Sequence, residues 1–136
     1  SYDFIFIDCP PSLGLLTVNA LTATDSIIIP IQCEYFPLVG LGQLMNTVRL
    51  IKKHLNPNIE IEGVLLTMKD NRSNLVSQVA GEIKKYFETK VYDTYIPRNV
   101  RLAESPSHSK PILLYDSKSK GATAYKALCE EFLRKQ

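Results

Sequence analysis

The first residue that could do chemistry is Asp8, which follows an apolar run, Phe4–Ile7. Such a run is typical of a strand buried on both faces of a parallel sheet. The strand must end at Cys9-Pro10-Pro11, because proline has no N–H for a sheet. Open α/β sheets bind ligands just outside the carboxyl ends of their strands, and a carboxylate there suits Mg²⁺, which prefers oxygen ligands. Taken alone, an aspartate that caps the next helix is the simpler interpretation.

The composition is that of an ordinary globular domain. The chain has 136 residues, of which 45% are apolar and 22% are charged, so we expect residues 1–136 to form a single domain with a buried core. The net charge of +2 neither demands nor excludes nucleic acid. Three widely spaced cysteines without a C-x-x-C pair favour a reducing compartment and argue against a structural zinc or disulfide framework. No apolar run is long enough to predict a membrane span.

Strands and helices are predicted to alternate after Asp8. The further strands are expected at residues 27–31, 61–68 and 91–96, and the helices at 13–22, 41–55, 75–87 and 100–104, with a last helix after residue 119. Ser12 is a predicted N-cap for the first helix, and Ser117 or Ser119 for the last. This alternation indicates an α/β fold, a mostly parallel sheet with flanking helices.

Several longer motifs resemble one family. Residues 2–14, YDFIFIDCPPSLG, resemble the Walker B and switch II segment of the ParA/Soj chromosome- and plasmid-partitioning ATPases. The resemblance continues through PIQCEY at 30–35, EGVLLTM at 62–68 and IPRNVRLAESPSH at 96–108. It covers essentially the whole chain and favours the Soj branch over the MinD and nitrogenase iron protein relatives. It implies a P-loop NTPase-like fold.

The phosphate-binding loop of that family is missing from this sequence. No G-x-x-x-x-G-K-[ST] occurs, so the backbone N–H nest, the phosphate-binding lysine and the Mg²⁺-binding hydroxyl are missing. In the family fold, the strand before that loop lies between the Asp8 strand and the strand at 27–30. We therefore expect a C-terminal fragment with an incomplete sheet that is inactive as an ATPase by itself. Its open sheet edge invites pairing with a second copy.

The resemblance assigns roles to residues at both ends of the chain. Asp8 would bind Mg²⁺ through water, and a switch that senses the γ-phosphate would include the residues Pro11, Ser12 and Gly14. The segment that packs around the adenine would comprise Pro97, Arg98 and Asn99, with Thr67 at the neighbouring strand end lining the same pocket. Ordinary loop chemistry also explains these residues, since proline stops a strand and asparagine turns the chain.

Arg72 and Arg101 resemble the arginines through which Soj-type dimers bind DNA without sequence preference. Arginine matches phosphate oxygens geometrically, and phosphate contacts supply nearly all non-specific affinity. Other cations could extend the patch, although a solvated helix face is the default interpretation for any single lysine; they are Lys69, Lys84, Lys85, Arg98 and Lys118.

The resemblance implies an intact protein that binds ATP and Mg²⁺, forms a homodimer around the nucleotide, and then binds DNA non-specifically. A ParB/Spo0J-type partner would stimulate hydrolysis, and the protein would be cytoplasmic and associated with the nucleoid. A non-enzymatic α/β interaction or DNA-binding module without nucleotide is the alternative. A receiver-type signalling domain ranks lower, because the adjacent acidic pair that its Mg²⁺ site needs is missing. A MinD-like membrane role would need a basic amphipathic tail, whereas the last residues are mixed in charge.

Overall fold

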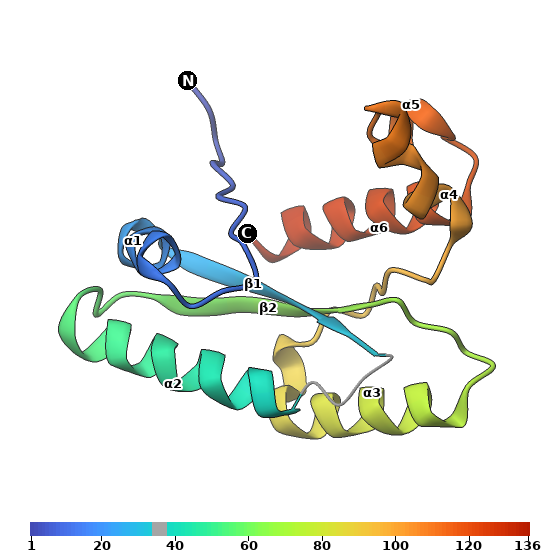
Figure 1. Ribbon diagram of the computed structural model, residues 1–136. Helices are drawn as coiled ribbons and strands as arrows, with labels where there is room; N and C mark the ends of the chain where they lie inside the picture. Colours follow the sequence, from blue (N-terminus) through green and yellow to red (C-terminus); the bar gives the residue numbers. More distant parts are fainter. Residues whose placement is uncertain (34–37) are drawn as a thin grey trace. The chain divides into compact units, whose positions relative to one another are not determined.

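Two strands paired in parallel form the sheet. The structure is a computed structural model that describes residues 1–33 and 38–136, and in this part of the chain β1 (Ser26–Gln32) pairs with β2 (Glu60–Thr67) (Figure 1). The Asp25 carbonyl accepts the Glu60 N–H at 3.2 Å, and the Thr67 carbonyl accepts the Cys33 N–H at 3.1 Å. The odd-numbered residues of β1 therefore direct their backbone groups at β2. Pro30 falls between them, so its missing N–H points away from β2 and the strand continues past it.

Helices precede and follow both strands, as the alternating pattern predicts. They are α1 (Leu15–Ala23), α2 (Leu38–His54), α3 (Asn74–Phe87), α4 (Val100–Glu104), α5 (Ile112–Tyr115) and α6 (Lys120–Lys135), with 3-10 turns at Glu88–Lys90 and Ser105–His108. The α/β class is confirmed. The last residues of the motif at 30–35 lie outside the described residues. None of the helices in the described part of the chain combines the length and the apolar character that crossing a bilayer requires.

The chain divides into two compact units, and the first consists of residues 1–27 and 38–62. Its core joins Leu21 of α1, Ile51 of α2 and Ile59, which are all buried. Asn56 follows α2, as predicted, and its side-chain amide donates to the carbonyl oxygens of Leu21 at 3.0 Å and Thr24 at 2.7 Å. The turn after α2 thereby satisfies carbonyls at the end of α1, which a helix C-terminus leaves without partners.

The predicted strand at Phe4–Ile7 is wrong. These residues form no strand, and their side chains are exposed, Ile5 by 84% and Phe6 by 72%. The physical reason is the lack of a neighbour: in the expected fold this strand pairs with one that is not among these residues, and in the described sheet β1 and β2 pair only with each other. An apolar run becomes a buried strand only when strands and helices cover it.

The first helix also begins later than predicted. Gly14, not Ser12, is the N-cap of α1, and its carbonyl accepts the Val18 N–H at 3.1 Å. The carbonyl of Ser12 instead accepts the Thr17 hydroxyl at 2.6 Å. Ser12 thus contributes to the start of α1 through its backbone rather than through its side chain.

The second unit has its own core, formed among residues 28–33 and 63–136. Leu65 of β2 packs with Tyr92 and Ile96, and partly buried apolar side chains cover them, namely Ile28, Leu102, Ala124, Leu128 and Phe132. The predicted cap of the last helix is confirmed, because the Ser119 hydroxyl accepts the Ala122 N–H at 3.1 Å. Two leucines of the helices in this unit, Leu75 of α3 and Leu133 of α6, are about half exposed.

The predicted fourth strand, residues 91–96, is only partly formed. Isolated parallel bridges join Val64 to Val91 and Lys69 to Pro97. Between these bridges the segment does not form a regular strand. The segment still runs beside β2, so its predicted place next to that strand is confirmed, whereas the predicted regular strand is wrong.

Candidate functional site

The end of β2 and the segment that follows residue 95 lie side by side in the second unit. The Lys69 N–H donates to the Ile96 carbonyl at 3.2 Å, and the Arg98 N–H donates to the Lys69 carbonyl at 3.2 Å. Thr67 ends β2 just before this contact. The structure thus brings Thr67 and Pro97 onto adjacent chain segments at the same sheet edge, where α/β folds place ligands.

The loop after β2 is held in an uncommon shape. Met68 has a φ of 53°, a left-handed conformation that costs a non-glycine residue energy. Lys69 Nζ lies 4.1 Å from the ring centroid of Tyr95, and the side-chain amide of Asn71 donates to the Tyr95 hydroxyl at 2.8 Å. Burial raises the pKa of the Cys33 thiol, and the positive charge of Lys69 lowers it by a smaller amount. Tyr95 therefore ties the loop after β2 to the segment before Pro97.

Asn99 carries an unmet hydrogen-bond acceptor. Its side-chain oxygen is buried and has no hydrogen-bond partner within the described residues. As the residue before α4, it makes no side-chain cap, and its backbone carbonyl accepts the N–H of Leu102 at 3.2 Å. Buried acceptors are normally satisfied, so this oxygen has an unused hydrogen-bonding capacity, which an N–H donor can reach only if the packing around it opens.

Arg72 forms a forked ion pair within its own loop. Its Nε and Nη2 donate to the two carboxylate oxygens of Asp70 at 3.0 and 2.9 Å, and its backbone N–H donates to Oδ1 at 3.0 Å. These bonds from the Arg72 side chain and backbone lower the pKa of Asp70 to about 2. The Arg72 side chain is 90% exposed, so this pair is open to water and to ions.

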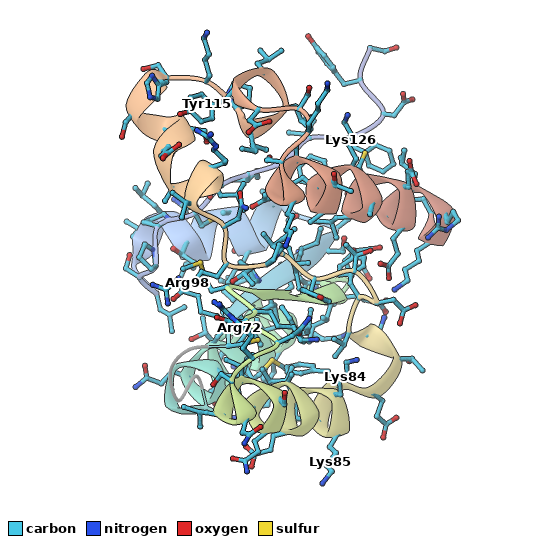
Figure 2. The ribbon with its side chains drawn as sticks, turned by 90° about the vertical axis from the view of Figure 1, so that its right-hand side faces the viewer. Arg72, Lys84, Lys85, Arg98, Tyr115 and Lys126 are labelled. Atoms are coloured by element: carbon cyan, nitrogen blue, oxygen red, sulfur yellow. The ribbon has the colours of Figure 1, made fainter. Side chains whose placement is uncertain are left out.

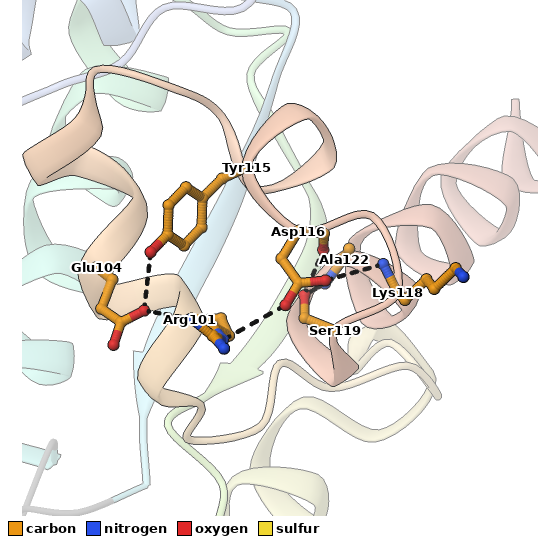
Figure 3. Close-up of polar contacts among 7 residues, drawn as sticks. All are labelled: Arg101, Glu104, Tyr115, Asp116, Lys118, Ser119 and Ala122. Carbon is orange, nitrogen blue, oxygen red and sulfur yellow. Dashed lines mark hydrogen bonds and ion pairs between the residues drawn. The ribbon is translucent and has the colours of Figure 1, made fainter.

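Arg101 is held by a larger network, drawn in Figure 3. Its Nη1 lies 3.1 Å from Glu104 Oε2, and its Nε lies 3.4 Å from Asp116 Oδ2. The hydroxyl of Tyr115 donates to the same Glu104 oxygen at 3.0 Å. Hydrogen bonding to Glu104, and then to Tyr115, raises the pKa of Arg101. Arg101 therefore joins α4 to the end of α5 while its side chain stays 55% exposed.

The predicted lysines have different surroundings. Lys84 and Lys85 are exposed and extend from α3 in Figure 2, which also shows Arg72 and Arg98 on the loops. Lys69 contacts Tyr95. The backbone N–H of Lys118 donates to Asp116 at 3.2 Å. Exposed cations thus occur in this unit, although carboxylates accompany both of its proposed DNA-binding arginines.

The predicted metal and switch residues lie in the first unit. Asp8, Pro11, Ser12 and Gly14 are exposed. The Ser12 N–H donates to the Pro10 carbonyl at 2.7 Å, so a tight turn leads into α1. No group of three or more His, Cys, Asp or Glu side chains among the described residues could hold a metal ion. Asp8 is an exposed carboxylate, and its role in binding Mg²⁺ stays a prediction.

Sequence reasoning missed one buried charge near the candidate site, Glu131 of α6. It is 4% exposed and accepts backbone N–H groups of residues 93 and 94. A signal exists in the sequence: Glu131 follows Ala124 by seven residues and Leu128 by three, which places a carboxylate on the apolar stripe of the helix.

Comparisons with known proteins find several relatives of this chain. A model for the AAA domain matches residues 1–61. Soj, the sporulation initiation inhibitor protein of Bacillus subtilis, is 66% identical over 131 residues, which is 96% of this chain and 52% of that protein. The chromosome partitioning protein ParA of Myxococcus xanthus is 56% identical over 98% of this chain and 47% of its own length.

Solved structures share the fold. Cobyrinic acid a,c-diamide synthase of Mycobacterium smegmatis, with bound ADP and magnesium, is 35% identical with a TM-score of 0.73, covering 93% of this chain and 45% of that one. The cell division ATPase MinD of Pyrococcus furiosus is 26% identical with a TM-score of 0.74, covering 98% and 52%. The chain spans about half the length of the curated relatives it matches, and it belongs to the ParA/Soj family of chromosome-partitioning ATPases.

Proposed function

We propose that this chain supplies the base-binding side of the nucleotide site of an ATP-dependent partitioning protein. One observation carries the proposal: the segment after Ile96 lies against the end of β2, and within it Asn99 presents a buried oxygen without a partner. Adenine offers an exocyclic N–H₂, which is the donor that this oxygen needs. Pro97 would add apolar contact to the base, with Arg98 and Thr67 beside it. The ADP and magnesium in a structural relative support this assignment.

A separate proposal concerns Asp8, in the first unit. Its carboxylate would hold Mg²⁺ through water, and the metal, when bound, would neutralise phosphate charge. The turn at Pro11 and Ser12, followed by the N-cap Gly14, is short and directly continuous with α1. A phosphate-dependent rearrangement of this turn would therefore be transmitted to the helix.

Nucleotide titration calorimetry with Mg²⁺ on the full-length gene product tests the base contact. Asn99→Ala should weaken ATP binding about fivefold, the effect of losing one hydrogen bond. Asn46→Ala is the matched control, because Asn46 lies on α2 in the first unit and its side-chain oxygen accepts from Arg49; it should leave ATP affinity unchanged. Equal affinities for the wild type and Asn99→Ala would remove the base-binding assignment.

The same titration on the present chain separates the two function classes. Without a phosphate-binding loop we expect no tight ATP binding. If the full-length protein binds DNA or a protein equally well with and without nucleotide, the non-enzymatic module is the better description.

We propose that Arg72 and Arg101 contact DNA phosphates. Both side chains are more than half exposed, and arginine can exchange a carboxylate for a phosphate because both offer paired oxygens. DNA must then displace Asp70 from Arg72, and Glu104 and Asp116 from Arg101. Binding of this kind weakens steeply as salt rises.

DNA retention by the full-length protein with ATP tests the two arginines. Arg72→Ala combined with Arg101→Ala should reduce retention at least tenfold, while Lys85→Ala should have a small effect. Asp70→Asn removes the competing charge and should increase retention. If the double variant retains DNA like the wild type, the DNA assignment is wrong.

The remaining parts of the proposal follow from family membership. Residues 1–136 would form one part of a single ATPase domain that pairs as a homodimer around ATP, acts on nucleoid DNA in the cytoplasm, and releases it when a ParB/Spo0J-type partner stimulates hydrolysis. ATP turnover by the full-length protein, measured with DNA and with and without such a partner, tests this cycle. No stimulation by the cognate partner would contradict it.

A further inference from the structure

Glu131 is the only charged side chain that is buried in the described part of the chain. Its Oε1 accepts the N–H of Asp93 and its Oε2 accepts the N–H of Thr94, both at 2.8 Å. Lys135, one turn later on α6, places Nζ 3.1 Å from Oε1 and 4.5 Å from the ring centroid of Tyr92. A buried carboxylate is costly unless it is fully hydrogen-bonded, so these contacts explain why α6 can keep it.

The two N–H groups that Glu131 accepts belong to a bulge. The Tyr92 N–H donates to the Val64 carbonyl and the Ile96 N–H donates to the Leu66 carbonyl, both at 2.9 Å. Between these bonds β2 advances by two residues, 64 to 66, while the facing segment advances by four, 92 to 96. A regular parallel ladder would advance equally on both sides. Residues 93 and 94 are therefore looped out of the ladder, and the Glu131 carboxylate accepts the N–H groups that the ladder leaves over.

This bulge sets the register of everything that follows it. The bulge adds two residues to this segment, whereas β2 has one extra residue of its own between Leu66 and Lys69, so from the Tyr92–Val64 bond to the Arg98–Lys69 bond the segment advances by six residues and β2 by five. Ile96 and Arg98 thereby arrive opposite Lys69 rather than beyond it. The hydrogen bonds of Lys69 with these two residues depend on that register. The position of Asn99, which directly follows Arg98, also depends on this register.

We propose that Glu131 is a positioning residue for nucleotide-base recognition: by holding the bulge at Asp93 and Thr94, it sets where Pro97, Arg98 and Asn99 meet the base. The proposal rests on the proposed function of that segment. Glu131 itself touches no ligand. Its loss would loosen the register and weaken the discrimination between adenine and guanine nucleotides, while the phosphate contacts, which come from other residues, would persist.

The experiment compares ATP and GTP affinities, each with Mg²⁺, in the full-length protein. Glu131→Gln keeps the size of the side chain, but its amide group faces one of the two backbone N–H groups and cannot accept it. The ratio of the two affinities should fall about fivefold, mainly through weaker ATP binding, with GTP affinity nearly unchanged. Amide hydrogen exchange at residues 93 and 94 should accelerate in the same variant.

A matched control separates positioning from plain stability. Leu128 packs in the same core from the same helix and accepts neither N–H group, so Leu128→Ala should destabilise the protein while preserving the ATP preference. If Leu128→Ala changes the ratio as much as Glu131→Gln does, or if Glu131→Gln does not change it, the positioning role is overturned. Should Glu131→Gln fail to fold, Lys135→Met removes only the supporting cation and should lower the ratio about twofold; an unchanged ratio there also overturns the proposal.

Asn99→Ala in the same assay distinguishes base binding by Asn99 from positioning by Glu131. If it abolishes the ATP preference and Glu131→Gln does not, base binding stands and the positioning role fails. If it preserves the preference, the base assignment fails and the positioning role fails with it.

Discussion

Two segments that were both predicted as strands have different surroundings in this molecule. Residues 4–7 are all apolar, whereas residues 91–96 include Asp93 and Thr94; both segments are short, and each is soon followed by proline. In the first, Ile5 is 84% exposed, whereas in the second Ile96 is 3% exposed. The second segment has β2 on one side and the carboxylate of α6 on the other. The first has no strand beside it in the described sheet.

The difference shows that neighbours decide whether an apolar run becomes part of a sheet. Both segments contain residues with a high preference for strands, and such preferences mainly express packing against neighbours. The 91–96 segment is irregular, and Val91, Tyr92 and Ile96 are still buried in it, because Glu131 accepts the N–H groups that the bulge leaves without a partner in the sheet. Four substitutions in the present chain test this contrast.

The largest effect is expected for Ile96→Ala. The side chain is buried against Leu65 and Tyr92, and truncating a buried isoleucine leaves a cavity, so the free energy of unfolding should fall by about 2–5 kcal/mol. Urea denaturation measures it. A loss below about 1 kcal/mol would mean that this segment is as loosely held as residues 4–7.

Gly63→Ala should be next in size. A Cβ at this position of β2 would lie 2.4 Å from Cε2 of Tyr92, whose ring is almost fully buried. Because the ring cannot easily move, we expect a loss of about 1–3 kcal/mol in thermal unfolding. Gly81→Ala in α3 is the control, since its Cβ meets nothing within 4 Å and alanine favours the helix.

Low pH should remove the contribution of Glu131 to the free energy of unfolding. Burial raises the pKa of this carboxyl, but hydrogen bonds from Thr94 and Asp93 and the Lys135 pair outweigh burial and lower the pKa to about 2, from 4.5. A lowered folded-state pKa stabilises above the unfolded value and loses that effect as pH falls toward the folded value. The wild type should exceed Glu131→Gln by about 1.5 kcal/mol at pH 7, and the gap should close between about pH 4.5 and 2. A stability difference between the wild type and Glu131→Gln that does not change with pH would contradict a stabilising role of the ionised Glu131 carboxylate.

Ile5→Ser should have the smallest effect, within about 0.5 kcal/mol, because the side chain is already in water. The same substitution in the full-length gene product sharpens the contrast. If a strand pairs with residues 4–7 there, Ile5→Ser should cost about 2 kcal/mol or more. Equal, small effects in both proteins would show that this segment is never covered.

The sequence predicts the regular elements well, because their patterns are local. The helices α2, α3 and α6 follow apolar repeats, and Ser119 caps α6 as expected. The bulge at residues 93–94 could not be predicted, because its stabilising group lies nearly 40 positions away, on α6.

The candidate site shows the same division. The adjacency of Thr67 and Pro97 follows from parallel strand ends, which sequence order predicts. The carboxylate partner of Arg72 is two residues away and could have been anticipated from an Asx turn. The contact of Arg101 with Asp116 joins separate helices, so spacing alone gives no sign of it.

Pro30 has a consequence for the outer edge of the sheet. An incoming β-strand on that side of β1 would find N–H groups at Ile28 and Gln32 but none at the proline between them. A β-strand that pairs along this edge therefore lacks one backbone hydrogen bond, the one opposite Pro30. The loss of this hydrogen bond weakens pairing with a second molecule. A strand of the same protein pays a smaller entropy cost to pair, so it tolerates the missing hydrogen bond better.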